Sequence, residues 1–454
     1  MASKTRDMTQ GSPTRLILSF CLPIIAGNLF QQLYNLVDTL VIGRIEGVTA
    51  LAAVSAAGWL DWAVLGLAIG MAQGFSIQIA QSFGAADYDE LRRAAGQSVL
   101  LSIGITVVLT ALSELSLRPI LVALNSPENT IELTWLYLRI IFGGAAFVMT
   151  FNLLAGFLRS LGDSRTPLYA MVAAALCNIA LDILFVAAFH WGVAGVAVAT
   201  VASQGVSCVI CLAALRHIPV IRLSRGDLRP QPAMMKRLMG LGVPIAFQNL
   251  IISIGGLVLQ RVVNDFGFVF MAGYNAATRL TGLLELAGSS LGSAVGTFAG
   301  QNLGARRLDR VRLGLRRSAQ IGVIMAFTVG ALVSLFARPL LLLFVNDEPE
   351  LVEQVLRVGC RYLYVASAGL FTLNLLFVYR STLQGLGDTM IPMISGFVEL
   401  VMRIGCALLL PRVIGEWGVY WAEVSAWVGA AALLIWGYYY RMRILSAQFE
   451  RQPS

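Results

Sequence analysis

Several polar side chains that can bind protons or cations lie inside apolar stretches long enough to cross a bilayer. Gln31, Asn35 and Asp38 occur within the apolar run 16–43 at spacings of four and three residues, so they share one face of a helix. A charged side chain at the centre of a membrane helix costs about 2.5–3.5 kcal/mol on insertion scales. Such carboxylates are usually functional, and we expect Asp38 to have a role in the activity.

A second polar group follows later in the same half of the chain. Asn178 and Asp182 are spaced i, i+4 in one apolar run and share a helix face, and Thr200 lies in the next run. Two carboxylates in a low-dielectric cavity cannot both stay ionised cheaply, so either a proton or a cation must lie between them. We therefore predict a coupling-ion site for H⁺ or Na⁺, formed by Asp38, Asn178, Asp182 and Thr200. The alternative is a hydrogen-bonded buried pair that only fixes helix packing.

Other polar residues within apolar runs are candidates for the wall of a substrate cavity. These are Gln31, Asn35, Tyr137, Asn152, Asn275, Glu285 and Asn374. Glu399 and Arg403 stand i, i+4 and are expected to pair with each other. Asp61 and Glu423 are expected near the ends of their spans.

The composition identifies an integral membrane protein. Of the 454 residues, 57% are hydrophobic and 13% are charged, whereas soluble chains carry about 25% charged residues. The net charge of +8 is concentrated in short loops between apolar runs, as the positive-inside rule requires, so we expect no nucleic-acid partner. The sequence has no phosphate-binding loop, metalloprotease motif or nucleophile elbow. We therefore expect neither an enzyme nor a cofactor, and an ion gradient as the source of energy.

Apolar runs separated by polar segments predict twelve membrane helices of about 20 residues or more. Their approximate limits are 16–42, 50–80, 95–116, 135–157, 167–189, 193–215, 238–263, 268–298, 315–336, 354–379, 390–411 and 418–440. The most basic connections, 216–237 and 306–317, fall on the same side as both termini. The prediction is a multi-pass protein of the cell membrane with both termini in the cytoplasm.

An internal repeat sets the expected architecture. LGDSRTP (161–167) recurs as LGDTMIP (386–392), and RPILVAL (118–124) recurs as RPLLLLF (338–344), at offsets of about 220–225 residues. Two further pairs of segments match in the same order. We expect an all-α protein with two parallel six-helix repeats around a central cavity. Its predicted parts are a cytoplasmic segment 1–15, an N-lobe 16–215, a basic cytoplasmic linker 216–237, a C-lobe 238–440 and a cytoplasmic tail 441–454.

The two intramembrane aspartates of the first half do not recur in the second half, although the surrounding sequence motifs do. Asp38 aligns with Leu259, and Asp182 aligns with Ala407. Because the second half folds without these acids, they are not demanded by the fold, and the predicted ion site belongs to the first half alone.

Four segments closely resemble the multidrug and toxic compound extrusion (MATE) transporters, and the DinF-like branch most of all. These segments are PIIAGNLFQQLYNLVDTLVIG, LAAVS, GFLRSLGDSRTP and NIALDILF. The resemblance implies a proton or sodium site in the N-lobe, at Asp38, Asn178, Asp182 and Thr200, and bending of the first helix near Pro23. The sequence departs from the NorM branch because it lacks an acid deep in the seventh span.

Together these features predict a secondary active antiporter. It would export organic, cationic or amphiphilic compounds by rocker-switch alternating access, with H⁺ or Na⁺ as the coupling ion. The alternative is a flippase for a lipid-linked or amphiphilic metabolite, and a channel is a third class. The expected partners are small organic substrates and the lipid bilayer, and we expect a monomer.

Overall fold

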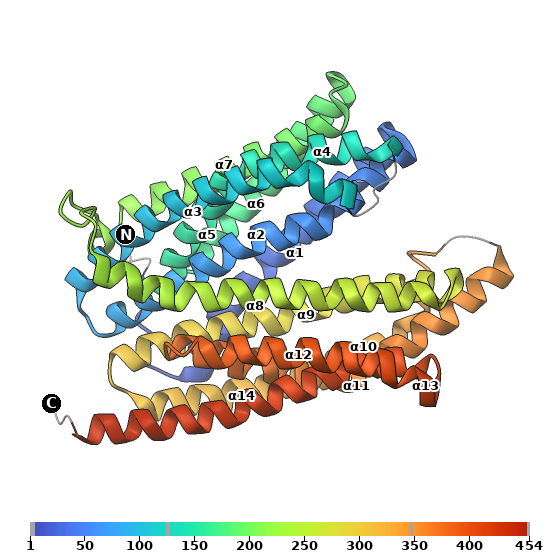
Figure 1. The fold of residues 1–454 in the computed structure, drawn as a ribbon. Helices are drawn as coiled ribbons and strands as arrows, with labels where there is room; N and C mark the ends of the chain where they lie inside the picture. Colours follow the sequence, from blue (N-terminus) through green and yellow to red (C-terminus); the bar gives the residue numbers. More distant parts are fainter. Residues whose placement is uncertain (1–4, 124–127, 346–347, 452–454) are drawn as a thin grey trace. The chain divides into compact units, whose positions relative to one another are not determined.

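A computed structural model describes residues 5–123, 128–345 and 348–451, and within these ranges the chain is made of helices and contains no strand (Figure 1). The chain divides into two compact units. Unit 1 comprises Met1–Met8 and Leu22–Asn249, and unit 2 comprises Thr9–Cys21 and Leu250–Ser454. These units are defined by packing and not by the repeat, so the lobe limits taken from the sequence stay a prediction.

Unit 1 contains most of the first helix and the helices that follow it, up to the first half of α8. Its elements are α1 (Pro13–Ile45), α2 (Gly47–Gly84), α3 (Tyr88–Ala123), α4 (Glu128–Gly143), α5 (Ala145–Ser160), α6 (Arg165–Asp182), the π-helical segment η1 (Ile183–Ala188), α7 (Gly192–Arg216), the 3₁₀ turn η2 (Pro219–Ile221) and α8 (Pro232–Asp265). In unit 2, the second half of α8 is followed by α9 (Phe268–Gly304), α10 (Leu308–Leu341), α11 (Pro349–Gly385), α12 (Met390–Leu409), the short α13 (Pro411–Ile414) and α14 (Trp417–Arg451).

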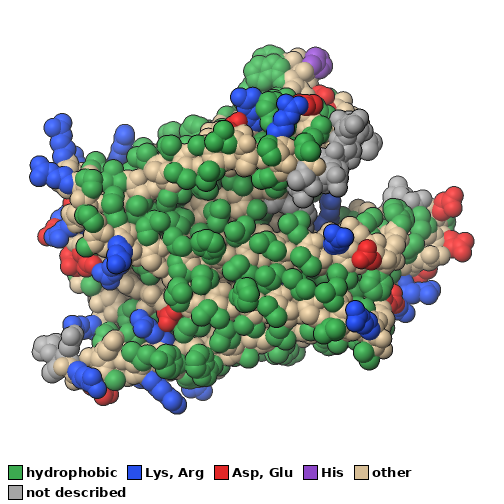
Figure 2. Space-filling view, in the orientation of Figure 1, with side chains coloured by type: hydrophobic (Ala, Val, Ile, Leu, Met, Phe, Trp, Pro, Cys, Tyr) green, Lys and Arg blue, Asp and Glu red, His purple; other side chains and the backbone are tan. Residues whose placement is uncertain are grey.

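The twelve predicted spans all coincide with helices of the structure. In the described part of the chain, ten helices are long and apolar enough to cross a membrane, and the bent pair α4–α5 makes an eleventh span. The remaining predicted span, 268–298, lies within α9, whose 37 residues correspond to about 55 Å of helix. The all-α, twelve-span prediction is therefore confirmed. Figure 2 shows hydrophobic side chains over the middle of the helices, with charged side chains gathered toward their ends.

The fourth span differs from its prediction as a single helix over 135–157. It consists of α4 and α5, which meet at Gly144 with a bend of 45°. Gly144 leaves helical geometry at φ −84° and ψ 1°. A Cβ atom at this position would lie 2.4 Å from Val201 of α7. The close approach of α7 requires glycine here, and the glycine is where the helix breaks.

The repeated sequence motifs form the same turns in both units. Gly162 and Gly387 both have positive φ, +85° and +78°, which glycine adopts without a steric penalty. The aspartate after each glycine then accepts a backbone N–H from the start of the next helix. Asp163 accepts from Thr166 at 3.0 Å, and Asp388 accepts from Ile391 at 3.2 Å.

A second pair of turns matches equally well. The turn between α2 and α3 and the turn between α9 and α10 both contain a non-glycine residue at φ 56°, Ala86 in the first and Arg306 in the second. The two turns also share their hydrogen bonds, since each of these N–H groups donates to a carbonyl three residues earlier, on Phe83 and on Leu303. The repeat seen in the sequence is therefore a repeat of local structure.

Helices α2 and α8 pack backbone to backbone within unit 1. A Cβ atom on Gly74 would lie 2.3 Å from the Cα of Gly242, and one on Gly70 would lie 2.6 Å from the Cα of Ala246. Small residues four apart on both helices allow this contact, as they do at many membrane helix interfaces.

Candidate functional site

The four residues of the predicted ion site come together inside unit 1. Asp38 lies on α1, Asn178 and Asp182 lie on α6, and Thr200 lies on α7. The carboxylate of Asp38 interacts with the side chains of the other three. Asn178 and Asp182 are both 0% exposed, so the cluster lies in the interior of the unit.

The position of Asp182 is set by a change in helix type. It is the last residue of α6, and the chain continues directly into the π-helical segment Ile183–Ala188. A π-helical segment widens the helix locally and is found frequently at functional sites. Asn178 lies one turn earlier on the same face, so both side chains are directed at Asp38.

The buried polar atoms of this cluster are not satisfied by ordinary hydrogen bonds. Among the residues that the structure describes, no partner of hydrogen-bonding geometry is found for Asp38 Oδ1, both Asp182 oxygens, both polar atoms of the Asn178 amide and Thr200 Oγ1. A buried polar group left unpaired costs about 1–3 kcal/mol, and more when it is charged. A packing cluster would be expected to satisfy these atoms internally. Their arrangement fits a site that is completed by a proton or a cation.

The donor set suits H⁺ or Na⁺ better than a transition metal. It contains two carboxylates, one amide and one hydroxyl, and hard cations prefer such oxygen ligands. In the described ranges, no group of three or more His, Cys, Asp or Glu side chains is placed to hold a metal ion.

Three residues that sequence reasoning missed extend the cluster. Asp61 of α2 interacts electrostatically with Tyr34 and Tyr137, although the sequence suggested a place near the end of a span. Its Oδ1 atom is buried and unpaired. Tyr34 of α1 also interacts with Gln204 of α7. Gln204 lies one helical turn beyond Thr200, and this i, i+4 spacing was a signal in the sequence that could have identified it.

The predicted cavity residues of unit 1 take different positions. Tyr137 of α4 interacts with Asp38 and Asp182 and so belongs to the surroundings of the ion cluster. Gln31 interacts with Tyr34, and the exposed Asn35 donates to Gln32 at 3.3 Å.

Asn152 of α5 is half-buried, and its amide donates to the carbonyl of Val148 at 2.9 Å. A role of these side chains in substrate binding stays a prediction.

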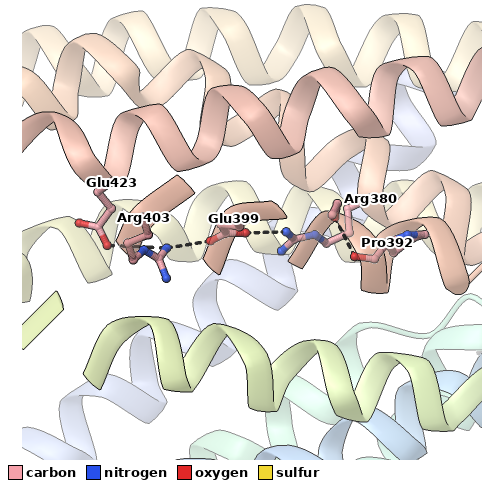
Figure 3. Close-up of polar contacts among 6 residues, drawn as sticks. Arg380, Pro392, Glu399, Arg403 and Glu423 are labelled. Atoms are coloured by element: carbon pink, nitrogen blue, oxygen red, sulfur yellow. Dashed lines mark hydrogen bonds and ion pairs between the residues drawn. The ribbon is translucent and has the colours of Figure 1, made fainter. Parts of the chain in front are cut away.

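Unit 2 contains a separate chain of buried charges (Figure 3). Glu399 accepts hydrogen bonds from Arg380 and Arg403, both at 2.8 Å, which confirms the predicted Glu399–Arg403 pair and adds a second arginine. Arg403 lies 3.9 Å from Glu423, which also accepts a hydrogen bond from Tyr362. Glu399 is thereby held between two cations.

The other predicted residues of unit 2 lie around this network or within the helix packing. Glu285 of α9 interacts electrostatically with Glu423 and Arg403. Asn374 of α11 is buried, and its amide donates to the carbonyl of Gly322 at 2.8 Å. Asn275 is half-buried on α9. Whether these three contact substrate stays a prediction.

Comparisons with known proteins agree with this architecture. A family model described as MatE matches residues 23–184 and 244–409. The chain is 27% identical over 449 residues to the probable multidrug resistance protein YoeA of Bacillus subtilis, covering 96% of this chain and 95% of that protein. It is 30% identical over 361 residues to the probable multidrug resistance protein YpnP of the same species, covering 78% of this chain and 80% of that protein.

A solved structure matches the fold over the whole length. A MOP superfamily transporter from Pyrococcus furiosus superposes with a TM-score of 0.91 at 24% identity, covering 97% of this chain and 98% of that one. A likeness at this identity bears on the fold, and it supports the two-repeat helical architecture.

Proposed function

Because the chain belongs to the MatE family of multidrug and toxic compound extrusion transporters, we propose that it is a secondary active antiporter driven by H⁺ or Na⁺. It exports organic, cationic or amphiphilic compounds, in keeping with the multidrug resistance names of its relatives. The coupling ion binds among Asp38, Asn178, Asp182 and Thr200 of unit 1.

The observation that carries this proposal is the contact between Asp38 and Asp182 in the unit interior, with unpaired oxygens on both. Two adjacent carboxylates repel when both are ionised. One proton held between them removes the repulsion, and so does one Na⁺ held by the carboxylates with help from the Asn178 and Thr200 oxygens. Binding of either ion therefore lowers the electrostatic energy of the two buried carboxylates.

The site can link ion binding to movement because its ligands lie on different helices. Asp38 is on α1, whereas its partners are on α6 and α7. An ion that holds these helices together favours one arrangement of α1, and ion release favours another. Each elementary charge that crosses a potential of 100 mV supplies about 2.3 kcal/mol, which is enough to bias an alternating-access equilibrium between the two halves.

Transport by the purified full chain in proteoliposomes tests the proposal, with ethidium as the probe. Proton and sodium gradients are imposed separately. The wild type is expected to move ethidium against its concentration gradient under at least one of them, and Asp38→Asn is expected to lose this movement. Asp265→Asn, which changes an exposed acid at the end of α8, serves as the matched control and should behave as wild type.

Three results would overturn the proposal. Downhill flux that ignores both gradients would indicate a channel. Flipping of a lipid-linked probe without ethidium transport would indicate a flippase. Gradient-driven transport by Asp38→Asn at the wild-type rate would remove the assigned ion site.

A further inference from the structure

A cavity in unit 2 lies outside both charge clusters. It measures about 870 Å³ and is bounded by residues of α10, α11 and α14. It lies at the end of unit 2 where α10 begins and α14 finishes, because Arg312 of α10 donates a hydrogen bond to Ser446 of α14 at 2.7 Å. This is one of the ends where the basic residues of the sequence are concentrated.

Two arginines line the cavity on one face of α10. Arg312 and Arg316 are four residues apart, so their side chains lie one helical turn apart, and both are exposed. Within the described part of the chain, neither forms an ion pair with a carboxylate. The cavity therefore presents two uncompensated positive charges, which suit an anionic group.

A buried hydroxyl in the same cavity also lacks a partner. Tyr438 of α14 lines the cavity and is 3% exposed, and its hydroxyl forms no hydrogen bond with any residue in the described ranges. It interacts electrostatically with Arg312 and packs edge-on against Tyr379, with ring centroids 5.6 Å apart. An oxygen-rich ligand beside Arg312 would satisfy this hydroxyl.

The cavity changes from charged to apolar along α10. Val323 and Ile324 lie about two turns beyond Arg316 and line the cavity with Leu315 and Met442. Ile324 is 66% exposed, so the apolar part is open to the surface of the helix bundle. The exposed side chains that follow on α10, including Phe327 and Leu335, continue the apolar surface past the middle of the helix. In a membrane protein this surface faces lipid chains.

The depth of the arginines fits the headgroup region. With 34 residues, α10 measures about 51 Å, against a hydrocarbon core of about 30 Å. Arg312 and Arg316 lie within the first nine residues of this helix, about 6–12 Å from its start. They are therefore placed where phosphate groups lie, and Val323 and Ile324, about 22–24 Å from the start of the helix, are placed among the acyl chains.

We propose that this cavity binds an anionic glycerophospholipid from the leaflet at the basic end of the protein. The phosphate contacts Arg312 and Arg316, the hydroxyl of Tyr438 donates to a lipid oxygen, and an acyl chain runs along Val323 and Ile324. Free phosphate would leave the apolar wall uncovered, and a zwitterionic lipid such as phosphatidylcholine would bring a cationic choline group next to the two arginines. Basic pockets between membrane helices bind anionic lipid headgroups by the same chemistry.

Thermal stability and lipid binding of the detergent-purified full chain test the proposal. The added probes are phosphatidylglycerol, phosphatidylcholine and inorganic phosphate. Phosphatidylglycerol is expected to raise the Tm of the wild type by mass action on the folded state, and native mass spectrometry should show one retained anionic lipid. The double variant Arg312→Gln/Arg316→Gln should bind phosphatidylglycerol about thirty-fold more weakly, since each basic residue near the membrane surface contributes several-fold to anionic lipid binding.

The matched control removes the same charge elsewhere. Arg443→Gln/Arg451→Gln changes two exposed arginines of α14 that do not line the cavity, and its response to phosphatidylglycerol should equal that of wild type. Tyr438→Phe should bind phosphatidylglycerol more weakly with unchanged helicity. The proposal is overturned if phosphatidylcholine gives the same Tm shift, if inorganic phosphate alone reproduces it, or if both double variants lose it equally.

Discussion

At the scale of single residues, the two buried charge clusters differ in whether their carboxylates are paired. The carboxylate oxygens of Glu399 accept hydrogen bonds from Arg380 and Arg403, whereas both oxygens of Asp182 lack a partner. Hydrogen-bonded buried carboxylates rigidify a structure, whereas unpaired ones carry a desolvation cost that a bound ion would relieve. This difference supports our proposal that the coupling ion binds in unit 1.

Asp38 and Asp182 are expected to act as one thermodynamic unit, because a shared proton or Na⁺ needs both carboxylates. Asp38→Asn and Asp182→Asn should each reduce gradient-driven transport at least ten-fold, and the double variant should lose less than about three-fold more. The measurement is a double-mutant cycle on initial transport rates at equal protein density. Losses that multiply as independent factors would contradict a shared site.

Glu399→Gln is expected to destabilise the protein strongly. The change leaves the buried Arg380 without its carboxylate partner and leaves Arg403 with Glu423 alone, at 3.9 Å. Breaking a buried ion pair in this way costs about 3–5 kcal/mol. Glu353→Gln is the control, since its pair with Arg338 is exposed and such pairs contribute about 0–1 kcal/mol. Thermal unfolding in detergent compares the two, and equal decreases in Tm would show that the network does not stabilise unit 2.

At the scale of elements, close helix packing depends on a few glycines. The contact of Gly74 with Gly242 brings α2 and α8 together with no side chain between them. The break of the fourth span at Gly144 has the same origin, because α7 passes where a Cβ atom would be. Glycine therefore determines both how near two helices lie and where one of them bends.

Gly74→Val is expected to lower stability by about 1–3 kcal/mol or more, because overpacking forces backbone shifts. The control is Gly58→Val on the same helix, where a Cβ atom would meet nothing within 4 Å. Both changes place a β-branched residue in α2, so the difference in Tm between the two variants isolates the contact with α8. If both variants unfold at the same temperature, this contact makes no net contribution.

At the scale of the whole molecule, the distribution of charge predicts the orientation in the membrane. The connection between α7 and α8 is strongly basic, as is the start of α10. From the positive-inside rule we expect these segments and both termini to lie in the cytoplasm.

Cysteine accessibility tests this orientation in a background whose six native cysteines are replaced by alanine. Gly226→Cys lies in the α7–α8 connection, where a Cβ atom comes no nearer than 3.6 Å to its neighbours. It should react with a membrane-impermeant maleimide only after cells are opened. Val413→Cys, on the exposed α13 that follows α12, should react in intact cells. The opposite pattern would reverse the topology and the direction of export.

The sequence by itself determined the membrane class, the twelve spans and the repeat, and it named the four residues that meet in the proposed ion site. These features follow from local physics. Hydropathy over about 20 residues marks a span, and the cost of burying a carboxylate marks Asp38 and Asp182 as functional. The i, i+4 spacing then places Asn178 beside Asp182 without any tertiary information.

Only the tertiary structure decided which side chains from different helices meet. It brings Asp61 and Tyr34 toward the ion site, attaches Arg380 to Glu399, and opens a cavity beside Arg312. These contacts depend on how each helix is rotated about its axis and where it crosses its neighbours. Hydropathy within a single span carries no information on either quantity, because lipid-facing and buried faces are both apolar in a membrane protein.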